Sequence, residues 1–431
     1  MSFASVAKGV TKTDRLDRND RAMSTRQQNT NAAKAVADAV RTSLGPLGMD
    51  KLIHGAKGDV VITNDGATIL KEMNVIHPAA KMLVELSESQ DVEAGDGTTS
   101  VVVVAGALIT AASGLLEKGL HPQTIAQAFL QASKMAQEVL SEMSIPVDVT
   151  DREELEKAVS TSLQSKVVSS LASHLAPIAV EAVCAVHRNL EDANVDLNDV
   201  RVVKQLGGTI DDSELVQGLV LPNQRVSRIA GGPTSCRDAK IGLIQFCLSL
   251  PKTDMDQQIT IKDYTAMDRL LRQERLQMAK MVKKIQATGC NVLLVQKSIL
   301  REAVNELALD FLAKANILVL RDIERDEVDF IARTVGCEPI SSLEHFTPER
   351  LGAAQLVEEQ VVGESRVVKF TGCKSDHTVS VILRASNRLT LEEAERSFRD
   401  AICVVRSMIR TRRLLPGGGA AETEMSIKLA E

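Results

Sequence analysis

The sequence predicts a multidomain protein that combines helical regions with an α/β region. Its 431 residues correspond to roughly three structural units, at about 150 residues per domain. Apolar residues recur with a helical period near both ends of the chain, whereas residues 207–384 mix strand and helix patterns. We therefore expect a mixed α/β unit that is inserted into a helical one.

The first region carries the helical signals. Apolar side chains recur with a helical period over residues 31–44, and the pattern stops at Gly45-Pro46. Further helices are predicted over residues 78–90 and 122–143. The 26 residues that open the chain mix Lys, Arg and Asp without an apolar run, so they predict a mobile tail and no secretory signal.

Residues 97–116 contain no charged side chain and are long enough to span a bilayer. The segment is rich in Ala and Gly, opens with three hydroxyl residues and has no flanking Trp or Tyr. These features favour a buried helix of a helical domain, and no membrane span is predicted.

The middle of the chain introduces strands. Residues 207–221 and 239–250 carry short apolar runs of the strand type. A strand, a helix, a second strand and a second helix are then predicted over 291–296, 299–315, 317–320 and 324–335. Such alternation indicates a βαβα unit with a parallel sheet.

Three more elements surround this unit. A long, heavily charged helix is predicted over residues 264–287, before the βαβα pattern. A hairpin of residues 366–371 with 378–384 follows it, and a helix over 391–413 returns the chain to helical structure.

Composition excludes several classes of function. The formal net charge is -6, aromatic residues make up 2%, and Trp is absent, so neither a basic field nor stacking platforms suggest nucleic acid as a partner. The seven cysteines are scattered without a C-x-x-C pair, which argues against a disulfide framework or a zinc site and favours a reducing, cytosolic compartment. The seven histidines show no metal-binding spacing.

The hexapeptide from Gly95 to Ser100, GDGTTS, is the strongest candidate for chemistry. Glycines let a backbone approach phosphate closely, free N–H groups at the start of the predicted helix would face the anion, and the hydroxyls of Thr98, Thr99 and Ser100 would add donors. Asp96 can hold Mg²⁺, which prefers one or two carboxylates together with phosphate oxygens. The alternative is an ordinary capped helix after a glycine turn. The chain has no Gly-Lys dipeptide, so this is not a Walker A loop.

Other positions resemble this loop in kind. The turns around Leu44-Gly45-Pro46 and Asp65-Gly66 are of the type that could approach a ligand, although each alone is more often an ordinary turn. The run from Gly417 to Gly419 offers a further close approach, with a flexible loop as its alternative. On the helix from Leu391, Asp400 falls roughly 140° from the centre of the apolar face. It is therefore either a solvated side chain or a carboxylate that orients a water molecule for phosphoryl transfer.

Seven stretches, spread over the chain in order, carry a resemblance to a known family. They are residues 42–46 (TSLGP), 58–60 (GDV), 62–70 (ITNDGATIL), 94–100 (AGDGTTS), 204–212 (KQLGGTIDD), 395–400 (ERSFRD) and 416–420 (PGGGA). With these stretches the sequence resembles the group II chaperonins, the TCP-1/TRiC family.

The resemblance implies a chaperonin fold with a helical equatorial domain, an α+β intermediate domain and an α/β apical domain with a helical protrusion. The expected equatorial segments are residues 27–147 and 410–431, the expected intermediate segments are 148–214 and 372–409, and the expected apical segment is 215–371. Residues 252–273 match the protrusion that acts as a lid, and the predicted helix 299–315 would touch unfolded clients.

The same resemblance implies roles for individual residues. Leu44, Gly45 and Pro46 would flank the nucleotide, Gly97 to Ser100 would hold its phosphates, and Asp96 would bind Mg²⁺. Asp65 and Asp400 match the acidic residues that position the attacking water. Lys166 matches the lysine that senses the γ-phosphate, and Gly418 matches the glycine beside the nucleoside. The implied cofactors are ATP and Mg²⁺.

The sequence departs from the family at three places. Leu47 stands where the family usually has Lys, and Gln164 replaces the usual Asn before Ser165-Lys166. The sequence stops at Glu431, within the helix that the resemblance implies as the first of the returning equatorial half.

These observations predict an ATP-dependent chaperone subunit that joins other chaperonin subunits in a double ring and closes a lid over unfolded client proteins. The alternative is a chaperonin-like protein that binds clients or partners without completing the ATPase cycle. A Rossmann-type oxidoreductase has only the βαβα unit and the glycine turns in its favour, and no dinucleotide fingerprint supports it.

Overall fold

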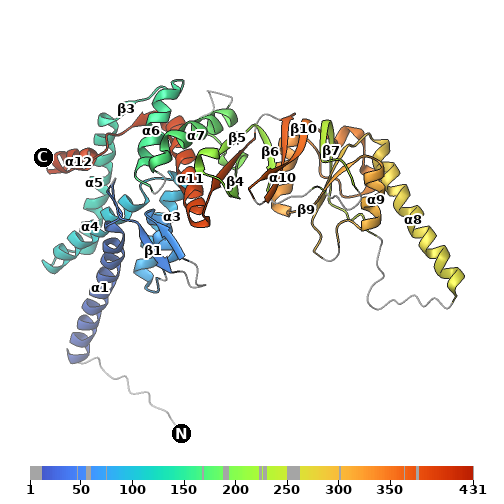
Figure 1. The fold of residues 1–431 in the computed structure, drawn as a ribbon. Helices are drawn as coiled ribbons and strands as arrows, with labels where there is room; N and C mark the ends of the chain where they lie inside the picture. Colours follow the sequence, from blue (N-terminus) through green and yellow to red (C-terminus); the bar gives the residue numbers. More distant parts are fainter. Residues whose placement is uncertain are drawn as a thin grey trace, which may run out of the picture. The chain divides into compact units, whose positions relative to one another are not determined.

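A computed structural model describes residues 12–45, 47–54, 60–73, 75–166, 169–187, 194–222, 226, 231–249, 263–299, 302–363, 365–374 and 378–430, with side chains from Thr25 onward except that of Ser170. The chain forms two compact units, one made of Met1–Ala172 with Arg399–Glu431 and one made of Ser173–Phe398. The first unit is largely helical, and the second contains the larger sheets (Figure 1). The expected insertion of an α/β region into a helical one is confirmed.

The first unit contains helices that the sequence patterns predicted and others that they did not. They are α1 (Lys12–Arg41), α2 (Gly66–Glu72), α3 (Pro78–Glu93), α4 (Thr98–Glu117), α5 (Pro122–Met143), α6 (Arg152–Gln164), the last part of α11 (Arg388–Thr411) and α12 (Ala420–Ala430). Two small antiparallel sheets pair β1 (Lys51–His54) with β2 (Val60–Thr63) and β3 (Ile145–Pro146) with β13 (Arg413–Leu414). The helices predicted over 78–90, 97–116 and 122–143 are confirmed.

Helix α1 is longer than its apolar pattern predicted. It begins at Lys12, so residues 12–26 are helical where the sequence predicted a mobile tail. The stretch from Lys12 to Arg41 contains neither Gly nor Pro, so nothing interrupts the helix on its amino-terminal side. The first 11 residues of the expected tail lie outside the described part of the chain.

Helix α4 packs on α1 and α3. A Cβ added to Gly106 would lie 2.3 Å from the Cβ of Ala37, so the glycine permits the close approach of α4 to α1. Val102 is fully buried, whereas Val104 and Leu108 are 48% and 45% exposed. The prediction of a buried helix therefore holds for one face only. Among the described residues, α4 is the one helix long and apolar enough to cross a membrane, judged by length and composition.

The second unit contains a six-stranded sheet in the order β6-β11-β10-β7-β8-β9. These strands are β6 (Gly218–Leu221), β7 (Ser235–Ile244), β8 (Val292–Gln296), β9 (Leu318–Ile323), β10 (Gly352–Val362) and β11 (Ser365–Cys373). β7, β8 and β9 are parallel, which confirms the predicted parallel βαβα unit. Side chains of α10 (Arg325–Val335) join the core on one face, and those of α8 (Tyr264–Ala287) and α9 (Glu306–Lys314) join the core on the other.

Helix α9 begins later than the sequence predicted. It starts at Glu306 instead of residue 299, because the residues before it pair with a segment after β7. The N–H of Leu248 donates to the carbonyl of Ala303 over 2.8 Å, and the N–H of Asn305 donates to the carbonyl of Leu248 over 3.1 Å. The protrusion predicted over 252–273 is described only from Asp263 onward, where it forms the start of α8, and residues 252–262 lie outside the described part.

The predicted hairpin of 366–371 with 378–384 is wrong. β11 pairs instead with β10, across a tight connection that contains Gly363 with a φ of 62°. β12 (Val379–Ala385) belongs to a separate sheet, where it lies parallel to β4 (Val200–Leu206) and antiparallel to β5 (Glu214–Val216). A glycine that accepts positive φ makes the shorter connection the better turn.

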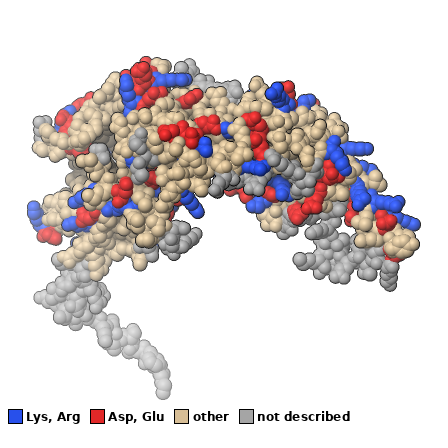
Figure 2. Space-filling model, in the orientation of Figure 1, with Lys and Arg blue, Asp and Glu red and all other residues tan. Residues whose placement is uncertain are grey.

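The remaining elements described in the second unit are α7 (Ala172–Val186), the first part of α11 and four short 3₁₀ helices, Leu197–Asp199, Ile210–Asp212, Leu343–His345 and Pro348–Arg350. A further 3₁₀ helix, Ser169–Leu171, lies in the first unit. The hydroxyl of Ser380 on β12 donates to the carbonyl of Gly218 over 2.8 Å, which links the two sheets. On the face shown in Figure 2, acidic and basic side chains are intermixed and form no large patch of one sign.

Candidate functional site

The GDGTTS segment forms a loop between α3 and α4. Gly95 and Gly97 adopt φ values of 72° and 75°, a conformation that favours glycine, and Gly97 is the N-cap of α4. No side chain caps the start of α4. The N–H groups of its first turn therefore have no acceptor among the described residues, and they form a ready site for an anion.

Two glycines let neighbouring elements approach this loop closely. A Cβ on Gly95 would lie 2.2 Å from the Cβ of Cys403 on α11. A Cβ on Gly66, at the start of α2, would lie 2.8 Å from the Cα of Thr99. Larger residues at either position would push the loop away from α11 or α2.

Asp65 joins the starts of α2 and α4. It is the N-cap of α2, where its Oδ2 accepts from the N–H of Thr68 over 3.0 Å and from the Thr68 hydroxyl over 2.7 Å. Its Oδ1 accepts from the hydroxyl of Thr98 over 2.9 Å. The Thr98 hydroxyl therefore already donates its hydrogen bond to Asp65. The donor of Thr98 that can bind a ligand is its backbone N–H.

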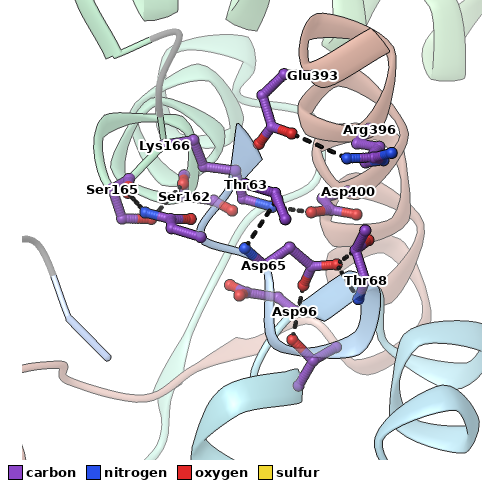
Figure 3. Close-up of polar contacts among 12 residues, drawn as sticks. Thr63, Asp65, Thr68, Asp96, Ser162, Ser165, Lys166, Glu393, Arg396 and Asp400 are labelled. Carbon is purple, nitrogen blue, oxygen red and sulfur yellow. Dashed lines mark hydrogen bonds and ion pairs between the residues drawn. The ribbon is translucent and has the colours of Figure 1, made fainter. Parts of the chain in front are cut away.

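Lys166 and Asp400 form a buried ion pair, although 234 positions separate them in the sequence (Figure 3). The side chains are only 8% and 11% exposed. The backbone beside Lys166 is fixed by Asn64, whose amide donates to the carbonyl of Ser165 over 2.6 Å. Asn64 directly precedes Asp65, and Ser165 directly precedes Lys166, so this hydrogen bond brings Asp65 near the lysine. Lys166 therefore lies close to both Asp65 and Asp400.

Asp400 lies opposite the apolar face of α11, as the helical periodicity predicted, but it is not a solvated side chain. Its residue is 8% exposed, because Lys166 covers that side of the helix. The interpretation in which Asp400 projects toward other site residues is therefore favoured over that of a solvated surface residue.

The pKa values of two aspartates near the site are shifted in opposite directions. Burial alone would raise the pKa of Asp65, but the charge of Lys166 and the hydrogen bonds from Thr68 and Thr98 bring that pKa below its ordinary value. Burial raises the pKa of Asp91, near the end of α3, and the neighbouring charge of Asp65 raises it further. Sequence reasoning missed Asp91, although its place four residues before Gly95 could have drawn attention to it.

The raised pKa of Asp91 predicts an effect on stability. The native state holds the proton of Asp91 more tightly than the unfolded state, so this group favours folding at low pH and loses that contribution as the pH rises through its folded pKa. We expect Asp91→Asn to raise the urea midpoint of unfolding at pH 7. The gain should vanish below about pH 4, where the acid is protonated in both states.

Asp65→Asn serves as the matched comparison, because the pKa of Asp65 is shifted in the opposite direction. It should lower the urea midpoint at pH 7 and have less effect in acid. A lower midpoint for Asp91→Asn at pH 7 would contradict the assignment.

Asp96 is exposed and directly precedes Gly97, the N-cap of α4. Its Oδ1 accepts from the N–H of Gly97 over 2.8 Å, and its carbonyl accepts from the side chain of Gln90 over 3.0 Å. No cluster of three or more acidic, histidine or cysteine side chains suited to a metal occurs in the described part of the chain. The donors therefore fit Mg²⁺ held by Asp96 together with phosphate oxygens, and they do not form a cage of protein ligands.

A family model described as the TCP-1/cpn60 chaperonin family matches residues 36–431. The chain belongs to this chaperonin family. The T-complex protein 1 subunit delta of Ochlerotatus triseriatus is 58% identical over 406 residues, which are 94% of this chain and 76% of that protein. The subunits of the same name from Homo sapiens and Arabidopsis thaliana are 54% and 55% identical, over 96% and 95% of this chain and 76% and 77% of their own lengths.

The chaperonin resemblance also singled out residues that the described contacts leave apart from this cluster. The turn at Leu44 and Gly45, where Gly45 has a φ of 86°, is closed by its own backbone, since the N–H of Met49 donates to the carbonyl of Thr42 over 2.9 Å. Pro46 lies outside the described residues. Gly418 has a φ of 72°, and a Cβ there would meet nothing within 4 Å. The proximity of these residues to a nucleotide remains a prediction.

Proposed function

We propose that this chain is an ATP-binding and ATP-hydrolysing subunit of a hetero-oligomeric cytosolic chaperonin ring. Membership of the chaperonin family and the similarity to proteins named T-complex protein 1 subunit delta support the proposal. The observation that carries it is the convergence of Asp65, Lys166 and Asp400 beside the uncapped start of α4. No observation within the described residues favours a chaperonin-like protein without turnover.

Each part of the site has a separate task in this proposal. The backbone N–H groups of Thr98, Thr99 and Ser100 bind phosphate oxygens, and Asp96 holds Mg²⁺. Gly97, whose own N–H donates to Asp96, lets the backbone approach the phosphates closely. Mg²⁺ supplies charge neutralisation at the phosphates when it is bound. Asp65 and Asp400 orient the attacking water. Lys166 pairs with Asp400 and its charge helps to lower the pKa of Asp65.

In the same proposal, the second unit supplies the apical domain and the sheet of the intermediate domain. Within the second unit, the six-stranded sheet with α8, α9 and α10 corresponds to the proposed apical domain, and the sheet of β4, β12 and β5 to the intermediate domain. The start of α8 contributes to the lid, and α9 contacts unfolded clients. ATP hydrolysis would drive lid closure over a client in the double ring.

The proposal is tested on the complex recovered with a tagged form of this chain. An azide-bearing ATP photoprobe with a label on its α-phosphate should attach to this chain in a complex of very large native mass. Labelling should require Mg²⁺ and competition by ATP should abolish it.

Asp96→Asn should weaken Mg²⁺-dependent labelling by about tenfold, because it removes the charged ligand of the metal. Asp148→Asn is a matched control, since Asp148 is an exposed carboxylate whose hydrogen-bond donors, within the described residues, both belong to Thr150. Equal labelling of the two variants would count against the metal role of Asp96. Absence of specific labelling on the unaltered chain would contradict the proposed function itself.

A further inference from the structure

Helix α11 contacts three parts of the site through three residues at three-residue spacing. Asp400 pairs with Lys166, Cys403 packs against Gly95, and Arg406 reaches the end of α3. Residues three apart on a helix lie on neighbouring parts of one face. One face of α11 therefore carries both an acidic residue of the site and the contacts to the loop.

Arg406 binds the backbone at the end of α3. Its Nη2 donates to the carbonyls of Val92 and Glu93, each over 3.0 Å. Both carbonyls belong to the last turn of α3, where no intrahelical N–H is available to them. A cation is also favoured at this position, because the carboxyl end of a helix carries partial negative charge.

The contact of Cys403 fixes the separation of the two elements. Cys403 is buried, and there is no room for a Cβ on Gly95, which lies two residues after Glu93. The cysteine thus stops the loop from moving toward α11, while Arg406 stops it from moving away. Asp96 and Gly97 come next in the chain.

We propose that Arg406 is a positioning residue, which sets the phosphate loop at a fixed distance from Asp400 by binding the end of α3. The inference rests on the proposed ATPase function of this site. Because Arg406 donates to the backbone of α3, it acts on turnover through the geometry of Asp400 and the loop.

The test measures, on this chain within the complex, how fast the photoprobe triphosphate is converted to the diphosphate, and separately how tightly it binds. Arg406→Ala should slow conversion by about tenfold to a hundredfold, the loss expected when a catalytic group moves by about 1 Å. The dissociation constant should change by less than about threefold, since the N–H groups at the start of α4 remain. Arg406→Lys, which keeps the charge and a donor, should recover part of the rate.

Arg410→Ala is the matched control on the same helix. Arg410 is an exposed residue that pairs with the side chain of Glu93 over 3.7 Å, and within the described residues it donates no hydrogen bond to a carbonyl of α3. Its removal should leave the rate of conversion unchanged, because exposed ion pairs contribute little.

A double-mutant cycle separates positioning from an independent effect. In the Asp400→Asn background, Arg406→Ala should slow conversion by no more than about twofold, because the group that Arg406 positions is already lost. Multiplication of the two losses, or an unchanged rate for Arg406→Ala alone, would overturn the proposal. Should Arg406→Ala prevent assembly, Arg406→Gln replaces it: a slower rate supports the proposal and an unchanged rate overturns it. If Asp400→Asn itself converts the photoprobe at the normal rate, the proposed function fails, whatever Arg406 does.

Discussion

Asp400→Asn is expected to slow ATP hydrolysis on this chain by about a hundredfold to ten-thousandfold, the range found when a positioned acid or base is removed. The substitution keeps the size of the side chain and removes its charge. Asn cannot form the ion pair with Lys166, and it cannot accept a proton from, or orient, a water molecule as a carboxylate does. Nucleotide affinity should change little, because the phosphate-binding N–H groups belong to the start of α4.

The measurement must report on this subunit alone, since other subunits of a hetero-oligomeric ring would also hydrolyse ATP. The photoprobe meets this need, because the label attached to this chain can be identified as triphosphate or diphosphate. Glu392→Gln is the control, since Glu392 lies on the same helix and pairs with the exposed Arg388 over 3.0 Å. Normal accumulation of diphosphate on the Asp400→Asn chain would exclude Asp400 from the hydrolysis step.

The local parts of the site were predictable from the sequence. The GDGTTS motif predicted a glycine turn ahead of a helix, and the structure has positive φ at Gly95 and Gly97 followed directly by α4. Turn geometry depends on the residues within the turn, so a short motif is enough to predict it.

The long-range parts of the site could not be derived from periodicity. The pairing of Lys166 with Asp400 depends on how α11 packs, and only the family resemblance brought both residues into the prediction. The helical period placed Asp400 away from the apolar face, but it could not show that a lysine from elsewhere covers that side. Arg406 escaped prediction for a similar reason, since its partners are backbone carbonyls, which carry no sequence signal.

The errors in the fold also arise from tertiary pairing. The hairpin of 366–371 with 378–384 joined two strand-like runs that were neighbours in the sequence, whereas β11 and β12 belong to different sheets. Helix α9 lost its predicted first residues because they pair with the backbone around Leu248. In both cases the strand and helix propensities were sound, and a competing backbone partner decided the outcome.

Lys166→Met is expected to have the largest effect on stability, a loss of about 3–5 kcal/mol, because breaking a buried ion pair leaves its partner charge uncompensated. Here two carboxylates lose their cation. Asp400 loses its direct partner, and Asp65 loses the charge that holds its pKa down against burial. Hydrolysis of ATP on the chain should also fall to the background rate.

The loss of stability caused by Lys166→Met should depend on pH. A carboxylate with a lowered folded pKa stabilises the native state above its unfolded pKa, and that contribution is lost as the pH falls through the folded value. The difference in urea midpoint between the unaltered chain and Lys166→Met should therefore be largest near neutral pH and shrink below about pH 4. Lys157→Met, at an exposed position on α6 that pairs with Glu153, should show neither the loss nor the pH dependence.

Adding Asp400→Asn to Lys166→Met should recover part of the stability, because one of the two uncompensated carboxylates is then neutral. It should recover none of the hydrolysis, because the missing carboxylate is the one that orients water. Recovery of stability without recovery of turnover would show that the ion pair stabilises the fold and that Asp400 has a separate role in hydrolysis. A double variant less stable than Lys166→Met alone would show that Asp400 is held mainly by groups other than the lysine, and the charge argument for the site would then be wrong.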